Sequence, residues 1–199
     1  MPIITIDGNI GCCKTSILNY LHKNYKLPVD LEPVDNWEPY LSKMYENEDV
    51  FKFQIRVWLD RCWIQEKSEK ITILMERSPY FIKNVFIKTA YELKMISHSE
   101  YNILLDLHKK TEGIWSSSSY IYLRSSPDNC LKRIKKRNRP SEKNITLEYI
   151  EQLHQSHEDN YQIALANKMN IICIDVDNKN ISDIANEIIT YFHDHLIAK

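Results

Sequence analysis

Residues 3–15 read IITIDGNIGCCKT: a short apolar run, a turn with two glycines, and a Lys-Thr pair that opens a helical pattern. Only three glycines occur in the 199 residues, Gly8, Gly11 and Gly113, so two of them are concentrated at this one turn. Glycine lets the backbone adopt positive φ or approach a ligand closely. A turn of this composition between a strand and a helix is typical of a phosphate-binding loop, where backbone N–H groups face an anion.

The Lys-Thr pair would carry the chemistry of this turn. Lys14 would reach the β- and γ-phosphates of ATP, and the Thr15 hydroxyl would bind Mg²⁺. The strict pattern G-x-x-x-x-G-K-[ST] fails at one position, because Cys13 stands where a glycine should precede the lysine. A side chain there could strain the backbone, at a cost on the order of 1–3 kcal/mol. A tight turn with a surface lysine is the alternative interpretation. The predicted ATP-binding loop comprises Gly8, Asn9, Ile10, Gly11, Cys12, Cys13, Lys14, Thr15 and Ser16.

Short apolar runs alternate with helical patterns along the rest of the chain. Strands are expected at 3–7, 28–31, 71–75, 120–123 and 171–176. Helices are expected at about 14–24, 38–67 with a break near Glu48, 80–111 with a break near Ser97, 127–137, 146–168 and 181–196. This alternation predicts right-handed crossovers and a parallel sheet. The expected fold is α/β, a P-loop NTPase fold with a five-stranded parallel sheet, helices on both faces and an Arg-rich lid at about 133–144, in one domain spanning 1–199.

Composition excludes several classes of partner. The net charge is −1, whereas a protein that binds nucleic acid is normally more basic. No apolar run reaches ~18 residues, so no membrane span is expected. The five cysteines match no zinc spacing and are interpreted as reduced thiols. The first strand begins almost at Met1, which leaves no room for a leader and predicts a cytoplasmic location or another reducing compartment.

Charged residues follow two of the predicted strands directly. Ligands bind at the carboxyl edge of open parallel sheets, so Glu32 and the pair Glu76-Arg77 should face the crevice of the phosphate loop. Glu32 could accept the proton of an attacking hydroxyl group. Glu76 would face Mg²⁺, and Arg77 would bind phosphate or hold Glu32. The alternatives are a glutamate at a helix start and a surface ion pair.

A basic run follows the fourth predicted strand. It contains Lys132, Arg133, Lys135, Lys136, Arg137 and Arg139. A solvated helix face or a nucleic-acid patch is one interpretation. The other interpretation is a lid whose arginines close over the transferring phosphoryl group. The adjacent polar loop, which contains Glu142, favours this interpretation.

Two other patterns receive a structural interpretation. His154 and His157 lie three residues apart, but no third metal ligand is near them in the sequence, so exposed helix positions are expected. Trp58 and Trp63 are interpreted as core or pocket wall.

With these residues in view, the chain resembles the deoxynucleoside kinase family, which includes deoxycytidine, deoxyguanosine, mitochondrial-type thymidine and insect multisubstrate kinases. The resemblance runs from residue 3 to about residue 178, and the compact size suggests a viral member. Its marks, in order, are DGNIG at 7–11, Glu-Pro-Val at 32–34 with Trp37, Phe53-Gln54, ERS at 76–78, IYLRSSP at 121–127, Arg-x-Arg at 137–139 and LHQSHED at 153–159.

The resemblance implies roles at the matching positions. Glu32 resembles the general base for the 5′-hydroxyl, and Gln54 resembles the residue whose amide pairs with the base. Tyr45 and Glu142 resemble the pair that holds the sugar 3′-hydroxyl, and Trp37 resembles a pocket wall. Arg77 resembles the phosphate-edge arginine; Arg133, Arg137 and Arg139 resemble the lid arginines, and Asp177 and Asn178 would belong to a loop that holds the ATP base. The family is generally dimeric.

The choice of base stays open at this point. Arg61 lies seven residues after Gln54, as in the deoxycytidine and deoxyguanosine kinases, but Ile82 stands where those enzymes have its aspartate partner. Thymidine-accepting members have smaller apolar residues at both positions, so this predicted pocket is a hybrid. A pyrimidine is favoured because Arg61 and Ile82 both take up room.

The expected function is therefore Mg²⁺- and ATP-dependent 5′-phosphorylation of a deoxynucleoside, thymidine or deoxycytidine, in nucleotide salvage. Its expected ligands are ATP and a deoxynucleoside, and its expected assembly is a homodimer. Two alternatives stay open: a nucleoside monophosphate kinase such as thymidylate kinase, and a nucleotide-binding protein whose catalysis is impaired by Cys13.

Overall fold

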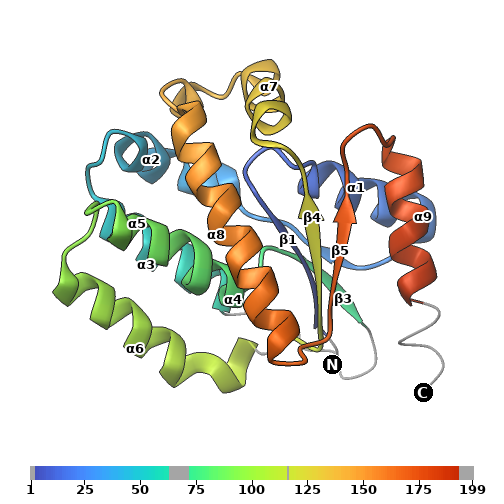
Figure 1. Ribbon diagram of the computed structural model, residues 1–199, viewed down its shortest axis with the longest axis horizontal. Helices are drawn as coiled ribbons and strands as arrows, with labels where there is room; N and C mark the ends of the chain where they lie inside the picture. Colours follow the sequence, from blue (N-terminus) through green and yellow to red (C-terminus); the bar gives the residue numbers. More distant parts are fainter. Residues whose placement is uncertain (1–2, 63–71, 116, 193–199) are drawn as a thin grey trace.

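The computed structural model describes residues 3–62, 72–115 and 117–192. Five parallel strands form one sheet in the order β2-β3-β1-β4-β5. The strands are β1 (Ile3–Gly8), β2 (Val29–Asp30), β3 (Ile73–Glu76), β4 (Ser119–Arg124) and β5 (Ile171–Asp175). The predicted five-stranded parallel α/β architecture is confirmed, as Figure 1 shows.

Helices α1 (Lys14–Tyr25) and α9 (Ile181–Phe192) cover one face of the sheet. They pack against the side chains of β1 and β4 that point to that face, including Ile6 and Ile121. Because side chains alternate along a strand, the intervening residues Tyr120 and Tyr122 point to the opposite face.

The opposite face is covered by α8 (Leu147–Ala166), α4 (Pro79–Phe81) and the π-helical segment η1 (Ile82–Ile87). An outer layer packs on η1 and forms a second apolar cluster. That layer consists of α2 (Val34–Tyr45), α3 (Val50–Cys62), α5 (Lys88–Glu92) and α6 (His98–Trp115). Helix α7 (Pro127–Arg137) and the 3₁₀ turn η2 (Pro140–Glu142) lie between β4 and α8 in the chain.

The structure departs from the sequence-based expectations in three places. The helix expected from residue 80 contains the π-helical segment η1, while its expected break near Ser97 is present between α5 and α6. The expected loop 137–144 contains η2. His157 is buried, not exposed, and its ring stacks on Tyr122 at 5.7 Å between centroids. Trp63, Ile71 and the expected helix ends at 63–67 and 193–196 lie outside the described residues.

None of the described helices is both long enough and apolar enough to cross a membrane.

Candidate active site

The carboxyl ends of β1, β2 and β3 bring the predicted site residues together. Ile6 of β1 pairs in register with Glu76 of β3, and Asp30 of β2 pairs with Met75. The loop after β1, the segment after β2 and the turn after β3 therefore leave the sheet at one edge. This is the edge at which open parallel sheets bind ligands.

Gly8 and Gly11 shape the loop between β1 and α1. Their φ angles are 145° and 82°, which side chains rarely adopt. A Cβ atom on Gly8 would lie 2.5 Å from the Leu123 carbonyl oxygen, and one on Gly11 would lie 2.5 Å from the Cys130 carbonyl oxygen. Only glycine fits at either position, because the obstructing atoms are backbone.

Cys13 adopts the left-handed conformation, with φ 68° and ψ 14°, directly before the first residue of α1. A non-glycine residue in that region is strained by roughly 1–2 kcal/mol. The loop therefore keeps the backbone conformation that glycine would favour. Cys13, which stands where the motif has glycine, adopts this conformation at a cost in conformational energy.

Lys14 is buried at the mouth of this loop. Its Nζ donates to the carbonyl oxygens of Asn9 at 2.9 Å and Gly8 at 3.2 Å. Asn9 anchors the loop to α8, since its Nδ2 donates to the Ile150 carbonyl oxygen at 2.9 Å. The lysine is thus held over the helix N-terminus, where an anion would be attracted.

Thr15 and Glu76 supply oxygen ligands of the kind that Mg²⁺ prefers. The Thr15 hydroxyl donates to Glu76 Oε1 at 2.7 Å, and Glu76 Oε2 accepts the Glu32 backbone N–H at 3.3 Å. Hydroxyl and carboxylate oxygens beside a phosphate loop fit a magnesium ion that is also bound by phosphate. Within residues 3–62, 72–115 and 117–192, no group of three His, Cys, Asp or Glu side chains forms a closed metal site.

Glu32 and Arg77 form a buried ion pair, with the Arg77 Nε donating to Glu32 Oε1. Arg77 has a left-handed φ of 62°, and its guanidinium carbon lies 4.1 Å from the centroid of the Phe86 ring. Burial alone would raise the pKa of Glu32, but the charges of Arg77 and Lys14 outweigh it and hold that pKa below its ordinary value. Glu32 is therefore ionised near neutral pH and can accept a proton.

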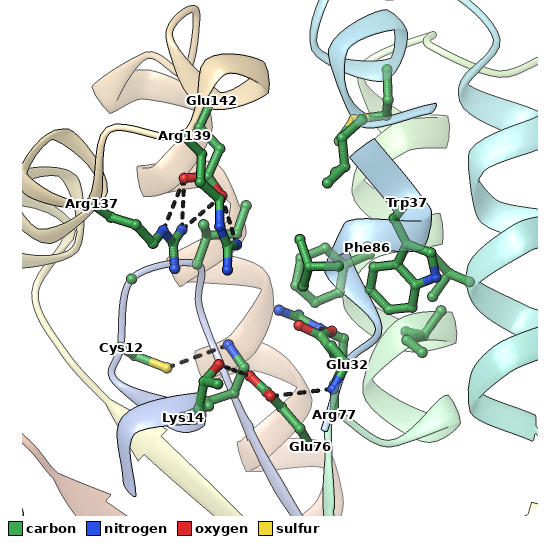
Figure 2. Close-up of a pocket in the computed structure, with 18 of the residues that line it drawn as sticks. Cys12, Lys14, Glu32, Trp37, Glu76, Arg77, Phe86, Arg137, Arg139 and Glu142 are labelled. Carbon is green, nitrogen blue, oxygen red and sulfur yellow. Dashed lines mark hydrogen bonds and ion pairs between the residues drawn. The ribbon is translucent and has the colours of Figure 1, made fainter. Parts of the chain in front are cut away.

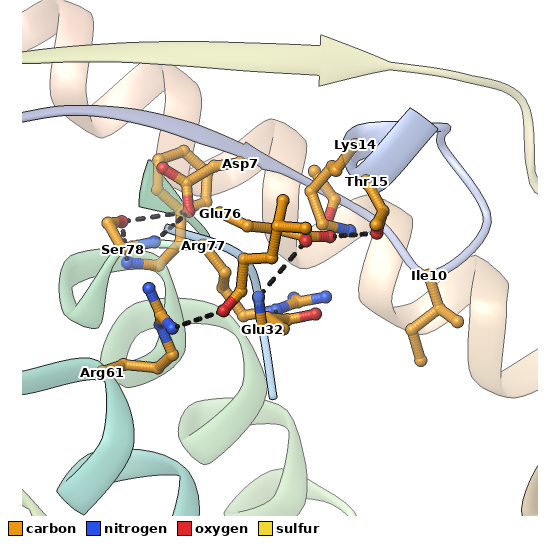
Figure 3. Close-up of polar contacts among 12 residues, drawn as sticks. Asp7, Ile10, Lys14, Thr15, Glu32, Arg61, Glu76, Arg77 and Ser78 are labelled. Carbon is orange, nitrogen blue, oxygen red and sulfur yellow. Dashed lines mark hydrogen bonds and ion pairs between the residues drawn. The ribbon is translucent and has the colours of Figure 1, made fainter. Parts of the chain in front are cut away.

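Burial and the nearby charge of Glu32 raise the pKa of Glu76. The carboxylates of Glu32 and Glu76 lie in the same crevice as two buried cations, Lys14 and Arg77. Figure 3 shows these four side chains between the loop after β1 and the turn after β3.

A cavity of about 290 Å³ joins this charged cluster to an apolar chamber. Glu32, Gln54 and Glu142 contribute polar atoms to its wall. The loop contributes Ile10 to Ser16; the apolar and aromatic lining consists of Val34, Trp37, Leu41, Met44, Tyr45, Phe53, Val57, Ile82, Phe86 and Tyr149. Figure 2 shows Trp37 and Phe86 on the wall opposite the lid.

The lid after α7 faces the same cavity. Arg137 donates to both carboxylate oxygens of Glu142, at 2.7 and 2.8 Å, and Arg139 donates to Glu142 Oε1 at 3.3 Å. The Glu142 side chain is only 4% exposed. The lid thus presents two arginines and one carboxylate to the cavity, as Figure 2 shows.

Besides Gly8 and Asn9 of the phosphate loop, four predicted ligand-binding residues lie outside this cavity lining, namely Arg61, Arg133, Asp177 and Asn178. Arg133 donates to Ser125 Oγ at 2.7 Å and pairs with Asp177 at 3.4 Å, and its Nη1 lies 3.4 Å from the Gly11 carbonyl oxygen. Asn178 follows Asp177 with a left-handed φ of 63°. Arg61 is buried, and its guanidinium donates to Asp30 and to the Leu31 carbonyl oxygen.

Several lining residues were not identified from the sequence. Phe86 and Tyr149 are the most consequential, since Phe86 packs against Arg77 and Tyr149 contacts Tyr45 edge to face at 6.3 Å. The signal for Phe86 was hidden by η1, because one extra residue per turn rotates it out of the α-helical pattern.

Comparisons with known proteins agree with this geometry. The sequence profile described as "Deoxynucleoside kinase" matches residues 4–197. Deoxycytidine kinase from Mus musculus is 31% identical over 190 residues, covering 78% of this chain and 73% of that protein. A protein of Invertebrate iridescent virus 3 is 27% identical over 175 residues, covering 83% of this chain and 89% of its own length.

The solved structures include one with the same fold over nearly the whole chain. Deoxyadenosine kinase from M. mycoides, with dCMP and dCDP bound, superposes with a TM-score of 0.83 at 26% identity. The match covers 96% of this chain and 98% of that one.

Proposed function

This chain belongs to the deoxynucleoside kinase family, and we propose that it transfers the γ-phosphoryl group of ATP to the 5′-hydroxyl of a deoxynucleoside. One observation carries the proposal. Glu32, an ionised carboxylate, lines the same cavity as the phosphate loop with Lys14 and Thr15. A base and a phosphate site that share one chamber can bring an alcohol and ATP into line.

On the acceptor side, Glu32 takes the proton of the 5′-hydroxyl. The hydroxyl oxygen forms its bond to the γ-phosphorus while the bond from that phosphorus to the β–γ bridging oxygen breaks, which leaves ADP. Arg77 orients the Glu32 carboxylate through their ion pair and places a positive charge near the transferring group.

On the donor side, Lys14 and the N-terminal turn of α1 bind the phosphates, and Arg137 and Arg139 offset their charge from the lid. Thr15 and Glu76 would hold Mg²⁺, which supplies charge neutralisation when it is bound with ATP. We propose that Arg133, Asp177 and Asn178 border the ATP base, since Arg133 lies against the loop at Gly11.

The remaining chamber suits a deoxyribose and a base. Tyr45 and Glu142 line it together and would bind the 3′-hydroxyl, while Trp37 forms its wall. Gln54 is buried and lines the chamber beside Ile82, so its amide can pair with a base edge. We propose a pyrimidine, because the apolar lining leaves Gln54 as the main polar group on that side.

The proposal is tested by measuring ADP release from ATP and Mg²⁺ with thymidine, deoxycytidine, deoxyadenosine and deoxyguanosine in parallel. We expect turnover with at least one pyrimidine nucleoside. Thymidine monophosphate as acceptor tests the alternative of a monophosphate kinase. Turnover with the monophosphate and none with thymidine would contradict the proposal.

The role of Glu32 has its own test. Glu32→Gln removes the proton acceptor and should lower kcat roughly 10²- to 10⁴-fold while the KM for ATP changes little. Glu151→Gln, on the exposed surface of α8, controls for the loss of a carboxylate. Near-normal turnover by Glu32→Gln would remove Glu32 from this role.

A second candidate function is nucleotide binding without efficient catalysis. The left-handed Cys13 in the phosphate loop favours it, because strain at this position could misplace the loop N–H groups. It predicts stabilisation by ATP without turnover, and substantial turnover would exclude it.

We also propose a homodimer in a reducing compartment such as the cytoplasm. Leu59 on α3 is 49% exposed and Ile103 on the neighbouring α6 is 48% exposed, which supports an interface on these helices. The five cysteines are free thiols. Sedimentation at micromolar concentration tests the dimer, and a Leu59→Glu variant should dissociate it.

A further inference from the structure

Arg61 is an almost completely buried cation that does not face the cavity. Its side chain is 1% exposed, its Nη2 donates to Asp30 Oδ2, and its Nη1 donates to the Leu31 carbonyl oxygen at 3.1 Å. Residues 54, 57 and 61 lie on one face of α3, and Gln54 and Val57 line the cavity while Arg61 does not. Arg61 lies four residues beyond Val57 on that face, and its hydrogen bonds show that its guanidinium reaches the chain that leaves β2.

That chain carries Glu32 and is weakly held by the sheet. Strand β2 is only two residues long, lies at the sheet edge and pairs with β3 alone. Beyond this strand, the Glu32 backbone N–H donates a long hydrogen bond, of 3.3 Å, to Glu76 Oε2. Arg61 supplies contacts to Asp30 and Leu31, the two residues immediately before Glu32. Figure 3 shows Arg61 near Glu32 and Arg77.

We propose that Arg61 is a positioning residue for the phosphoryl-transfer reaction: it anchors Asp30 and Leu31 to α3 and thereby sets where the Glu32 carboxylate sits. The inference rests on the proposed function, because it assigns Arg61 to the base-catalysed step and not to recognition of the nucleoside base. Asp30, whose side chain is 34% exposed, neutralises the buried guanidinium.

The two roles predict different kinetics. A residue that contacts the nucleoside base changes KM, and the change depends on which base is present. A residue that positions the catalytic carboxylate changes kcat by the same factor for every accepted nucleoside, since a displacement of about 1 Å can cost roughly 100-fold in rate.

The test uses Arg61→Met, since Asp30 can be solvated once its partner is gone. Removing Asp30 instead would leave a buried cation without a partner, which destabilises folding. Arg61→Met should lower kcat roughly 10- to 100-fold with every nucleoside that the wild type accepts, while nucleoside KM changes less than about threefold. Arg61→Lys, which keeps the charge, should recover part of the loss. Lys52→Met, which removes an exposed ion pair from the same helix, is the matched control.

Hydrogen exchange gives a second readout that does not depend on turnover. Amides at 30–34 should exchange faster in Arg61→Met than in the wild type, while those of β1 stay protected. A KM effect confined to one base, an unchanged kcat, or unchanged exchange at 30–34 would each overturn the proposal. A wild type without turnover on any nucleoside would refute the proposed function, and the exchange result would still decide whether Arg61 anchors this segment.

Discussion

At the residue scale, Cys13 occupies a backbone conformation that its side chain disfavours. Its φ of 68° is set by the loop geometry, since the next residue begins α1 and the preceding loop is fixed by Gly8 and Gly11. The sequence motif alone indicated that a glycine was missing, and the structure shows that the glycine-type backbone is kept.

Replacing Cys13 by glycine should relieve this strain. Cys13→Gly is expected to raise the free energy of unfolding by about 1 kcal/mol and either to raise kcat or to lower the KM for ATP. Urea denaturation and steady-state kinetics measure the two effects.

Lys26→Gly is the matched control, because Lys26 ends α1 in the same left-handed region with φ 57° and is exposed. It should stabilise the protein without altering kinetics. Identical kcat and KM for ATP in Cys13→Gly and the wild type would show that the Cys13 side chain does not impair the function of the loop.

At the scale of elements, the phosphate loop is packed against the backbone of β4 and α7. Cys130 lies in the first turns of α7, and its carbonyl oxygen blocks any Cβ on Gly11. The lid helix and the phosphate loop therefore have a fixed separation at this point, and the rest of α7 extends from it to Arg137.

Gly11→Ala should disrupt this contact. We expect a loss of more than about 2 kcal/mol of stability, or loss of ATP binding, because a Cβ atom would lie 2.5 Å from backbone. Gly113→Ala is the control, since no atom lies within 4 Å of its added Cβ and its helical position should gain roughly 0.5–1 kcal/mol. Thermal unfolding with and without ATP compares them, and equal behaviour of the two variants would contradict the explanation.

A second contact between elements ties the lid to α2. Glu38 accepts hydrogen bonds from the backbone N–H of Ser141 at 3.2 Å and from its hydroxyl at 2.9 Å. Ser141 directly precedes Glu142, so this contact holds the lid carboxylate over the cavity.

Breaking the contact should loosen nucleoside binding. Glu38→Ala is expected to weaken nucleoside affinity by about 1–2 kcal/mol, measured as KM or by calorimetry. Ser141→Ala should weaken nucleoside binding less than Glu38→Ala does. The double variant should lose less binding free energy than the sum of the two single losses, with a coupling energy above about 0.5 kcal/mol. Full additivity would show that the two residues act independently.

The sequence predicted the sheet and the strand-end residues because strand periodicity and motif order are local properties. Glu32, Glu76 and Arg77 meet at one edge for the same reason that all parallel strands share a carboxyl edge. It could not predict that Arg61 pairs with Asp30, because that contact depends on the orientation of α3 relative to β2. Nor could it find Phe86, which depends on the π-helical turn of η1.

At the scale of the whole molecule, Asp7 in the sheet interior makes the stability of the fold depend on pH. Asp7 of β1 is fully buried; its Oδ1 accepts from the Ser78 backbone N–H at 2.7 Å and the Ser78 hydroxyl at 3.0 Å. Its Oδ2 has no hydrogen-bond partner within the described part of the chain. Burial raises the pKa of Asp7 from 3.8 to about 6.

The raised pKa gives a signed prediction. The unfolded chain loses this proton near pH 3.8 and the folded protein near pH 6, so Asp7 contributes stability below pH 3.8 that is lost as pH rises through 6. Asp7→Asn keeps the acceptor oxygen but cannot ionise. The difference in free energy of unfolding between this variant and the wild type should therefore shift in favour of the variant by roughly 2–3 kcal/mol from pH 4 to pH 8. Urea unfolding at the two pH values measures it, and a pH-independent difference would contradict it.

The central claim concerns which atom receives the phosphoryl group, and transfer from γ-³²P-labelled ATP tests it most directly. The protein is incubated with Mg²⁺, labelled ATP and each deoxynucleoside, and with 5′-deoxythymidine, which lacks the acceptor hydroxyl. The account predicts label in a deoxynucleoside 5′-monophosphate, formed in equal amount with ADP, and none with 5′-deoxythymidine. Folded protein that binds ATP and labels no deoxynucleoside, or that labels 5′-deoxythymidine equally well, would contradict it.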